Sequence, residues 1–205
     1  MIEDLWWRWV DRLEAQGWGA RAMVRPPAGQ DVIAAAGEVV GGFPDELAAL
    51  YRLADGQVGS RHVDGLRTNL FPGHEFLPLA GARRAWQGWA DIRATYTADD
   101  VDDVDDVDEM ITVRGHDPVH RVYTRAPWWP LAEDGGGNHL MVDLDPPPGG
   151  TVGQVLVAGP DEDERRVLAP GIGAYLQALL AAELDDPDPA ALADGVAWWD
   201  APTLR

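Results

Sequence analysis

The chain has 205 residues, of which 46% are hydrophobic and 25% are charged. This composition is typical of a globular protein with one sizeable core, and no run reaches the roughly 18 apolar residues that a membrane span needs. The first residues, MIEDLWWRWV, carry acids and tryptophans instead of a basic flank and a long apolar stretch, so they do not resemble a signal peptide. The absence of cysteine excludes disulfides and thiolate metal sites, and we expect a cytoplasmic location.

The charge of the chain is strongly acidic and unevenly distributed. The formal net charge is −19; residues 1–98 hold 12 acids and 10 arginines, whereas residues 99–205 hold 23 acids and 6 arginines. Such a field disfavours nucleic acids and anionic membranes and attracts basic partners, although acidity can also serve solubility alone. The chain has no lysine, so a catalytic lysine is excluded. Its one serine, Ser60, is not surrounded by a nucleophile-elbow sequence.

The first half of the chain predicts helices. Apolar residues recur at helical spacing in residues 2–15, 32–40, 44–54 and 79–96. Asp31 can cap the second of these helices, and Pro44 suits the first turn of the third. In the last of them, Trp86, Trp89 and Ile92 fall on one face, which we expect to point inward.

The second half predicts short strands followed by a helix. Strand-like segments are VHRVY, WWPLA, HLMVDLD, VGQVLV and RRVLA, within residues 119–169. Residues 161–164 form a polar turn between the last two segments, and residues 172–180 have the apolar spacing of a helix. This order of elements favours a single α+β domain with a mixed or antiparallel sheet flanked by helices. Residues 1–185 form this domain, and residues 186–205 are expected to be an appendage.

The segment AEDGGGNHLMVDLDP is the strongest candidate for a chemical site. It lacks a P-loop lysine, and its adjacent glycines precede a strand instead of opening a helix, which excludes the phosphate-binding fingerprints. Four residues offer oxygen ligands, although their spacing does not match a calcium loop: Asp134, Asn138, Asp143 and Asp145. We therefore expect a tight turn with left-handed glycine backbone and a strand that pairs with QVLV. We expect no metal, cofactor or catalytic site.

Two further features are candidates for partner binding. Trp128 and Trp129 are adjacent, so on a strand one of them should face outward, where tryptophan often serves an interface. Residues 99–109, DDVDDVDDVDE, contain eight acids in eleven positions. Blocks of like charge are commonly exposed interaction segments, although this one can also be a solvated insertion.

Four segments occur in a characteristic order: GFPDELAALYRLADGQ, LFPGHEFLPL, WWPLAEDGGGNHLMVDLDPPPGGTVGQV and YLQALL. In this order they resemble the SUKH superfamily, which contains fungal cell-wall-assembly regulators of the Smi/Knr type and many bacterial immunity proteins. The resemblance covers about residues 28–184 and implies an α+β domain that binds proteins and is not an enzyme. The helix at residues 2–15 and the segments 99–109 and 186–205 lie outside the pattern.

The resemblance implies an immunity protein that neutralises a basic toxin, such as a nuclease. A regulatory or scaffold protein of the Smi/Knr type is the alternative, and a metal-dependent hydrolase using Asp134, Asp143 and Asp145 is a remote one. The candidate partner-binding residues are Asp99, Asp100, Asp102, Asp103, Asp105, Asp106, Trp129, Asp134, Asp143 and Asp145.

Overall fold

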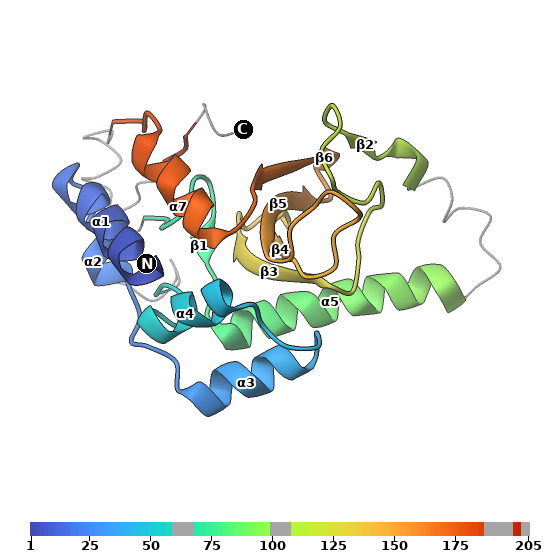
Figure 1. Ribbon diagram of the computed structural model, residues 1–205, viewed down its shortest axis with the longest axis horizontal. Helices are drawn as coiled ribbons and strands as arrows, with labels where there is room; N and C mark the ends of the chain where they lie inside the picture. The colour runs from blue at the N-terminus through green and yellow to red at the C-terminus, as the bar shows by residue number, and fades with distance from the viewer. Residues whose placement is uncertain (59–67, 99–107, 187–198, 202–205) are drawn as a thin grey trace.

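The computed structural model describes residues 1–58, 68–98, 108–186 and 199–201. Its elements in chain order are α1 (Ile2–Ala15), α2 (Ala20–Met23), α3 (Gln30–Glu38), α4 (Asp45–Leu53), β1 (Glu75–Phe76), α5 (Leu79–Ala98), β2 (Thr112–Val113), β3 (Trp128–Glu133), β4 (His139–Asp143), β5 (Gln154–Gly159), β6 (Glu162–Ala169) and α7 (Ile172–Ala181). Figure 1 shows α1, α2 and α7 grouped on one side of the sheet, whereas α5 runs along another side. The predicted α+β class is confirmed.

The sheet has six strands in the order β1-β3-β4-β5-β6-β2. Neighbours from β1 to β6 pair antiparallel, and β2 pairs parallel with β6, so the sheet is mixed. The predicted pairing of HLMVDLD with QVLV is confirmed, because Val142 of β4 lies opposite Val155 of β5. The central strands β4 and β5 are buried along their whole length, as expected for strands covered on both faces.

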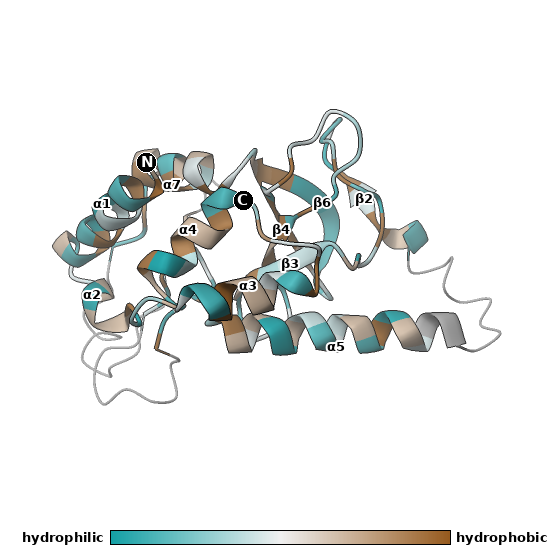
Figure 2. Cartoon of the chain, turned by 60° about the horizontal axis from the view of Figure 1, so that its bottom comes forward, coloured by the Kyte–Doolittle hydropathy of each residue, from teal (hydrophilic) through white to brown (hydrophobic). Residues whose placement is uncertain are grey.

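The two faces of the sheet belong to two apolar clusters, because successive strand residues point to opposite sides. The larger cluster joins α1, α4 and α7 to the strand residues Trp129, Leu131, Leu140, Val142 and Val155. The smaller cluster joins Trp89 of α5 to Trp128, Met141, Leu156 and Ala158. In Figure 2, hydrophobic and hydrophilic residues alternate along α4 and α5, as expected for helices that bury one face.

The tryptophan pair of β3 corrects one prediction. Trp128 is 2% exposed and Trp129 is 0% exposed. The prediction that one of them faces outward is wrong, because each face of the sheet carries its own cluster and both rings are covered. Trp129 therefore offers no side-chain surface to a partner.

The C-terminal segment is not wholly an appendage. Trp199 is buried, and its ring centroid lies 5.5 Å from that of Trp9 and 6.3 Å from that of Trp18. Asn69 fixes the backbone of Trp199 by donating from Nδ2 to its carbonyl oxygen at 2.8 Å and accepting from its amide at 3.1 Å. Trp199 and Ala201 thus belong to the core, and the rest of the predicted appendage, residues 187–198 and 202–205, lies outside the described residues.

The helix predictions for residues 2–15 and 172–180 are confirmed by α1 and α7. The predicted cap at Asp31 is wrong, because α3 begins one residue earlier, with Gly29 at the N-cap position. Asp31 instead lies in the first turn, where a carboxylate is favourable near the positive end of the helix dipole. Pro44 is the N-cap residue of α4 and does not lie within its first turn.

Two strand predictions also need correction. Residues 119–123 form no strand, because the carbonyl oxygens of Val122 and Tyr123 accept hydrogen bonds from the side chain of Arg165 at 3.1 and 2.8 Å. The parallel edge strand β2 occupies residues 112–113 instead. The polar turn predicted at residues 161–164 is shorter, since β6 already begins at Glu162.

Candidate functional site

A cavity of about 640 Å³ lies between the sheet and the C-terminal part of the chain. Leu140 of β4, Val157 of β5 and Leu168 of β6 contribute its apolar lining. Residues 72–74, α7 and residues 199–201 contribute the surrounding walls. This volume falls within the range of pockets that bind small ligands or side chains, about 300–1,000 Å³.

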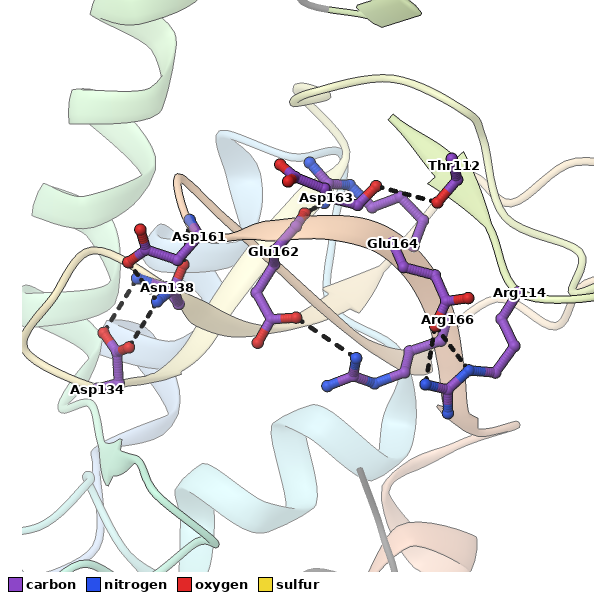
Figure 3. Close-up of polar contacts among 10 residues, drawn as sticks. Thr112, Arg114, Asp134, Asn138, Asp161, Glu162, Asp163, Glu164 and Arg166 are labelled. Carbon is purple, nitrogen blue, oxygen red and sulfur yellow. Dashed lines mark hydrogen bonds and ion pairs between the residues drawn. The ribbon is translucent and has the colours of Figure 1, made fainter. Parts of the chain in front are cut away.

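Asp134 lines this cavity and closes the turn between β3 and β4 (Figure 3). Its Oδ1 accepts hydrogen bonds from the amides of Gly136 and Asn138 at 2.7 and 3.0 Å, and its Oδ2 accepts one from Asn138 Nδ2 at 2.7 Å. Desolvation acts to raise the pKa of Asp134, but these hydrogen bonds outweigh it and hold the pKa below its usual value. The main role of the carboxylate is therefore to hold the turn by accepting these hydrogen bonds.

Asn138 links this turn to the one between β5 and β6. Its Nδ2 donates to Asp161 Oδ2 at 3.2 Å, and its Oδ1 accepts from the Asp161 amide at 3.0 Å. Gly137 has a φ of +104°, which confirms the predicted left-handed glycine. The triple-glycine segment is thus an architectural turn, and its Asn joins two strand connections.

The rim of the cavity on β6 carries an ion pair between Arg166 Nη1 and Glu162 Oε2, at 3.4 Å (Figure 3). The Nε of Arg166 is buried and has no hydrogen-bond partner among the described residues. On the same strand, Glu164 pairs with Arg114, whose Nη2 lies 2.8 Å from the carboxylate. Arg166 therefore has donor capacity that the described part of the chain does not use.

His74 lines the cavity and holds a hydrogen-bond acceptor. Its Nδ1 lies 2.6 Å from the carbonyl oxygen of Pro72 and therefore carries the proton, because a carbonyl only accepts. Burial lowers the pKa of His74, so the ring is neutral and Nε2 holds a bare lone pair. This Nε2 is buried without a partner in the described ranges.

Tyr175 of α7 adds a hydroxyl group. The residue lines the cavity and is 2% exposed, and no hydrogen bond of its hydroxyl is found within the described residues. Burial raises the pKa of Tyr175, so the hydroxyl stays protonated and can both donate and accept. Its ring is held by Phe71, at a centroid distance of 5.9 Å.

Asp143 and Asp145 lie at the other end of β4, away from Asp134. Asp143 is 0% exposed and accepts from Gln154 Nε2 and from the Asp145 amide, both at 3.1 Å. Burial raises the pKa of Asp143, against the opposing effect of these hydrogen bonds. Asp145 pairs with Arg125 at 2.9 Å. Asp143 thus closes the loop after β4 and has no exposed surface for a partner.

The predicted site residues therefore do not come together. Asp134 lines the cavity, Asp145 is on the surface, and Asp143 and Trp129 are buried, whereas Asp99, Asp100, Asp102, Asp103, Asp105 and Asp106 lie outside the described residues. Across the described ranges, no group of three or more His, Cys, Asp or Glu side chains is placed to hold a metal ion. The sequence interpretation missed His74, Arg166 and Tyr175. Their segments are far apart in the chain, and no local pattern connects them.

Comparison with known proteins identifies the family. A family model described as "SMI1 / KNR4 family (SUKH-1)" matches residues 27–178. The chain belongs to this family. The match includes His74, Asp134, Arg166 and Tyr175, whereas the remaining walls of the cavity near residues 185 and 199–201 lie beyond it.

Several fungal members of the SMI1/KNR4 family are similar to the chain. It is 26% identical to the cell wall assembly regulator SMI1 of Saccharomyces cerevisiae over 155 residues, which are 65% of this chain and 30% of that protein. It is 39% identical to a glucan synthesis regulatory protein of Neurospora crassa over 166 residues, 69% of this chain and 30% of that protein. The chain spans about a third of the length of these relatives. None of the described helices is long and apolar enough to cross a membrane.

Proposed function

We propose that this SMI1/KNR4-family chain is a regulatory module that acts by docking a protein partner and does not turn over a substrate. The observation that carries the proposal is the cavity, whose lining residues His74 and Arg166 hold buried nitrogens, Nε2 and Nε, without a partner among the described residues. Tyr175 adds a hydroxyl for which no hydrogen bond is found within those residues. Buried polar groups are normally satisfied, so groups left open around one cavity suit a bound molecule. The names of the fungal relatives, regulators of cell wall assembly and glucan synthesis, support the regulatory role.

An immunity protein that neutralises a basic toxin is the second candidate. The charge distribution favours it, since residues 99–205 contain 23 acids and 6 arginines and would attract a basic nuclease. The relatives named above favour a regulator instead. The metal-dependent hydrolase alternative is weakened, because Asp134 and Asp143 serve separate turns at opposite ends of β4.

The proposal is tested by capturing the partner from the cells that encode the chain. The immobilised chain and a Gly159→Val control are compared by quantitative mass spectrometry, and the retained protein is then purified and titrated calorimetrically. The control should misfold, because a Cβ at Gly159 would lie 2.2 Å from Asn138 Oδ1.

We expect one cellular protein that binds the native chain in a defined ratio and is not retained by the control. If that protein is a nuclease whose activity the chain abolishes, the immunity candidate replaces the regulatory one. Finding no protein that depends on the native fold would contradict both.

A further inference from the structure

We propose that the cavity receives a basic side chain, lysine or arginine, carried by a short extended segment of the partner protein. The inference rests on the proposed function, because the ligand is part of a protein. It assigns the contact to the space lined by His74, Arg166, Tyr175, Asp185 and Asp200.

Three lining residues of the cavity carry hydrogen-bonding groups for which the described part of the chain shows no partner. His74 Nε2 can only accept, Arg166 Nε can only donate, and the Tyr175 hydroxyl can do both. An anion would satisfy the donors but not His74, and an isolated cation would satisfy His74 but not Arg166. A peptide segment has amide donors, carbonyl acceptors and side chains, so it can satisfy all three groups.

The lining of the cavity is acidic. Four acidic residues from separate segments line the cavity: Asp134, Glu162, Asp185 and Asp200. Arg166 is the one arginine among the lining residues that the structure describes, and it is paired with Glu162. Asp134 and Asp185 form no ion pair with an arginine within the described residues, so the field over this partly apolar surface is negative and favours a positively charged group.

Part of the lining is apolar. Leu140, Val157 and Leu168 provide an apolar floor within a volume of about 640 Å³. Lysine and arginine bury their methylene stems along apolar surface while the charged group contacts polar atoms. The floor and the acidic walls therefore match the two ends of one basic side chain.

The walls divide between two parts of the chain. His74, Arg166 and Tyr175 lie inside the region that matches the family, whereas Asp185 and Asp200 lie beyond its last matched residue, 178. The family region thus supplies the groups suited to a peptide backbone together with Asp134 and Glu162, and the segment after it adds Asp185 and Asp200 to the acidic lining.

The inference is tested with blocked tripeptides and the full-length chain. The probes are acetyl-Ala-Arg-Ala-amide, its citrulline analogue, which is nearly isosteric but uncharged, and its glutamate analogue. Binding is followed by NMR of the chain labelled with ¹⁵N-histidine, using the ring nitrogens of His74. We expect a saturable shift with the arginine peptide, about fivefold weaker binding of the citrulline peptide, and no saturable shift with the glutamate peptide.

Two double variants separate local charge from overall charge. The double variant Asp185→Asn with Asp200→Asn removes two negative charges at the cavity. It should weaken the binding of the arginine peptide about fivefold. Asp31→Asn with Glu38→Gln removes the same charge from exposed positions on α3 and should leave affinity nearly unchanged. Tyr175→Phe should weaken the binding of both the arginine and the citrulline peptide. It should not lower the melting temperature, because the Tyr175 hydroxyl has no internal partner among the described residues.

Equal affinity for the arginine and citrulline peptides would overturn the inference, as would the absence of a saturable shift at His74. Equal losses of affinity for the arginine peptide in the two double variants would also overturn it, because the effect of charge would then not be local. If these peptides fail while the native chain still retains a cellular protein, the cavity assignment is wrong and the proposed function stands.

Discussion

Arg165 is a buried cation that is held by backbone carbonyls. It is 0% exposed and donates to Val122 and Tyr123 at 3.1 and 2.8 Å, and also to the carbonyl of Glu162. Its guanidinium lies 5.8 Å from the ring centroid of Trp128. Burial lowers the pKa of Arg165 to about 10, so the side chain is still charged at neutral pH. One residue thus fastens residues 122–123 onto the sheet.

We expect Arg165→Met to lower the free energy of unfolding by about 2–4 kcal/mol, because it leaves buried carbonyl oxygens without donors. Urea denaturation measures the change. Arg114→Met is the matched control; it removes an exposed pair with Glu164 and should cost about 1 kcal/mol or less. Similar losses in both variants would show that the buried hydrogen bonds contribute little.

The lowered pKa of Asp134 predicts how the stability of the fold depends on pH. Its pKa is lowered in the folded state, so its ionised form stabilises the fold above the unfolded pKa, and this contribution is lost as pH falls through the folded pKa. Asp134→Asn should therefore be less stable than the wild type at pH 7, and the difference should narrow below about pH 4. Denaturation of both proteins from pH 7 to pH 3 tests this, and a difference that stays constant would contradict it.

At the scale of elements, the link between the β3–β4 and β5–β6 turns depends on Gly159. A Cβ there would lie 2.2 Å from Asn138 Oδ1 and 2.4 Å from its Cα, where backbone cannot move aside easily. The close approach lets Asn138 contact Asp161 and fixes the start of β6. Two strand connections therefore form one structural unit.

Gly159→Ala should lower the free energy of unfolding by about 2 kcal/mol or more, since it breaks this link. Thermal and urea denaturation report the loss. Gly88→Ala in α5 is the control, because its Cβ would meet nothing within 4 Å, and removing an exposed helical glycine should stabilise by about 0.5–1 kcal/mol. A harmless Gly159→Ala would mean that the turns are not coupled.

Elements that depend on local sequence patterns could be predicted, whereas elements that depend on contacts between distant residues could not. The helices α1 and α7 have periodic apolar faces, so their positions could be predicted from local pattern. Residues 119–123 have strand-like composition, but they do not pair with a strand. The side chain of Arg165, distant in sequence, donates hydrogen bonds to the carbonyl oxygens of Val122 and Tyr123 instead. Long-range contacts of this kind leave no periodic signal in the sequence.

The candidate site shows the same division. The Asp134 turn and its left-handed glycine could be predicted from DGGGN alone, because the hydrogen bonds of that turn span only a few residues. The cavity could not, since His74, Arg166 and Tyr175 converge only when the sheet and α7 assemble. Trp199 was likewise missed because its partners, Trp9 and Trp18, lie near the other end of the chain.

At the scale of the whole molecule, the net charge of −19 predicts how association depends on salt. Replacing Asp102, Asp103, Asp105 and Asp106 with Asn should lower the rate of association with a basic partner at low salt, with little change in stability. The difference should shrink as salt shortens the Debye length to about 8 Å at physiological strength. Stopped-flow kinetics measure it, and equal rates at every salt concentration would leave the acidic run as a solvated insertion.

The central claim is that a protein partner docks at the cavity. Hydrogen–deuterium exchange of the chain, with and without the protein that it retains from its own cells, tests this claim most directly. We expect slower exchange at residues 72–74, 162–168 and 199–201, which contribute to the lining of the cavity, and no change in α3. Slower exchange confined to α3, or to other surfaces away from the cavity, would contradict it.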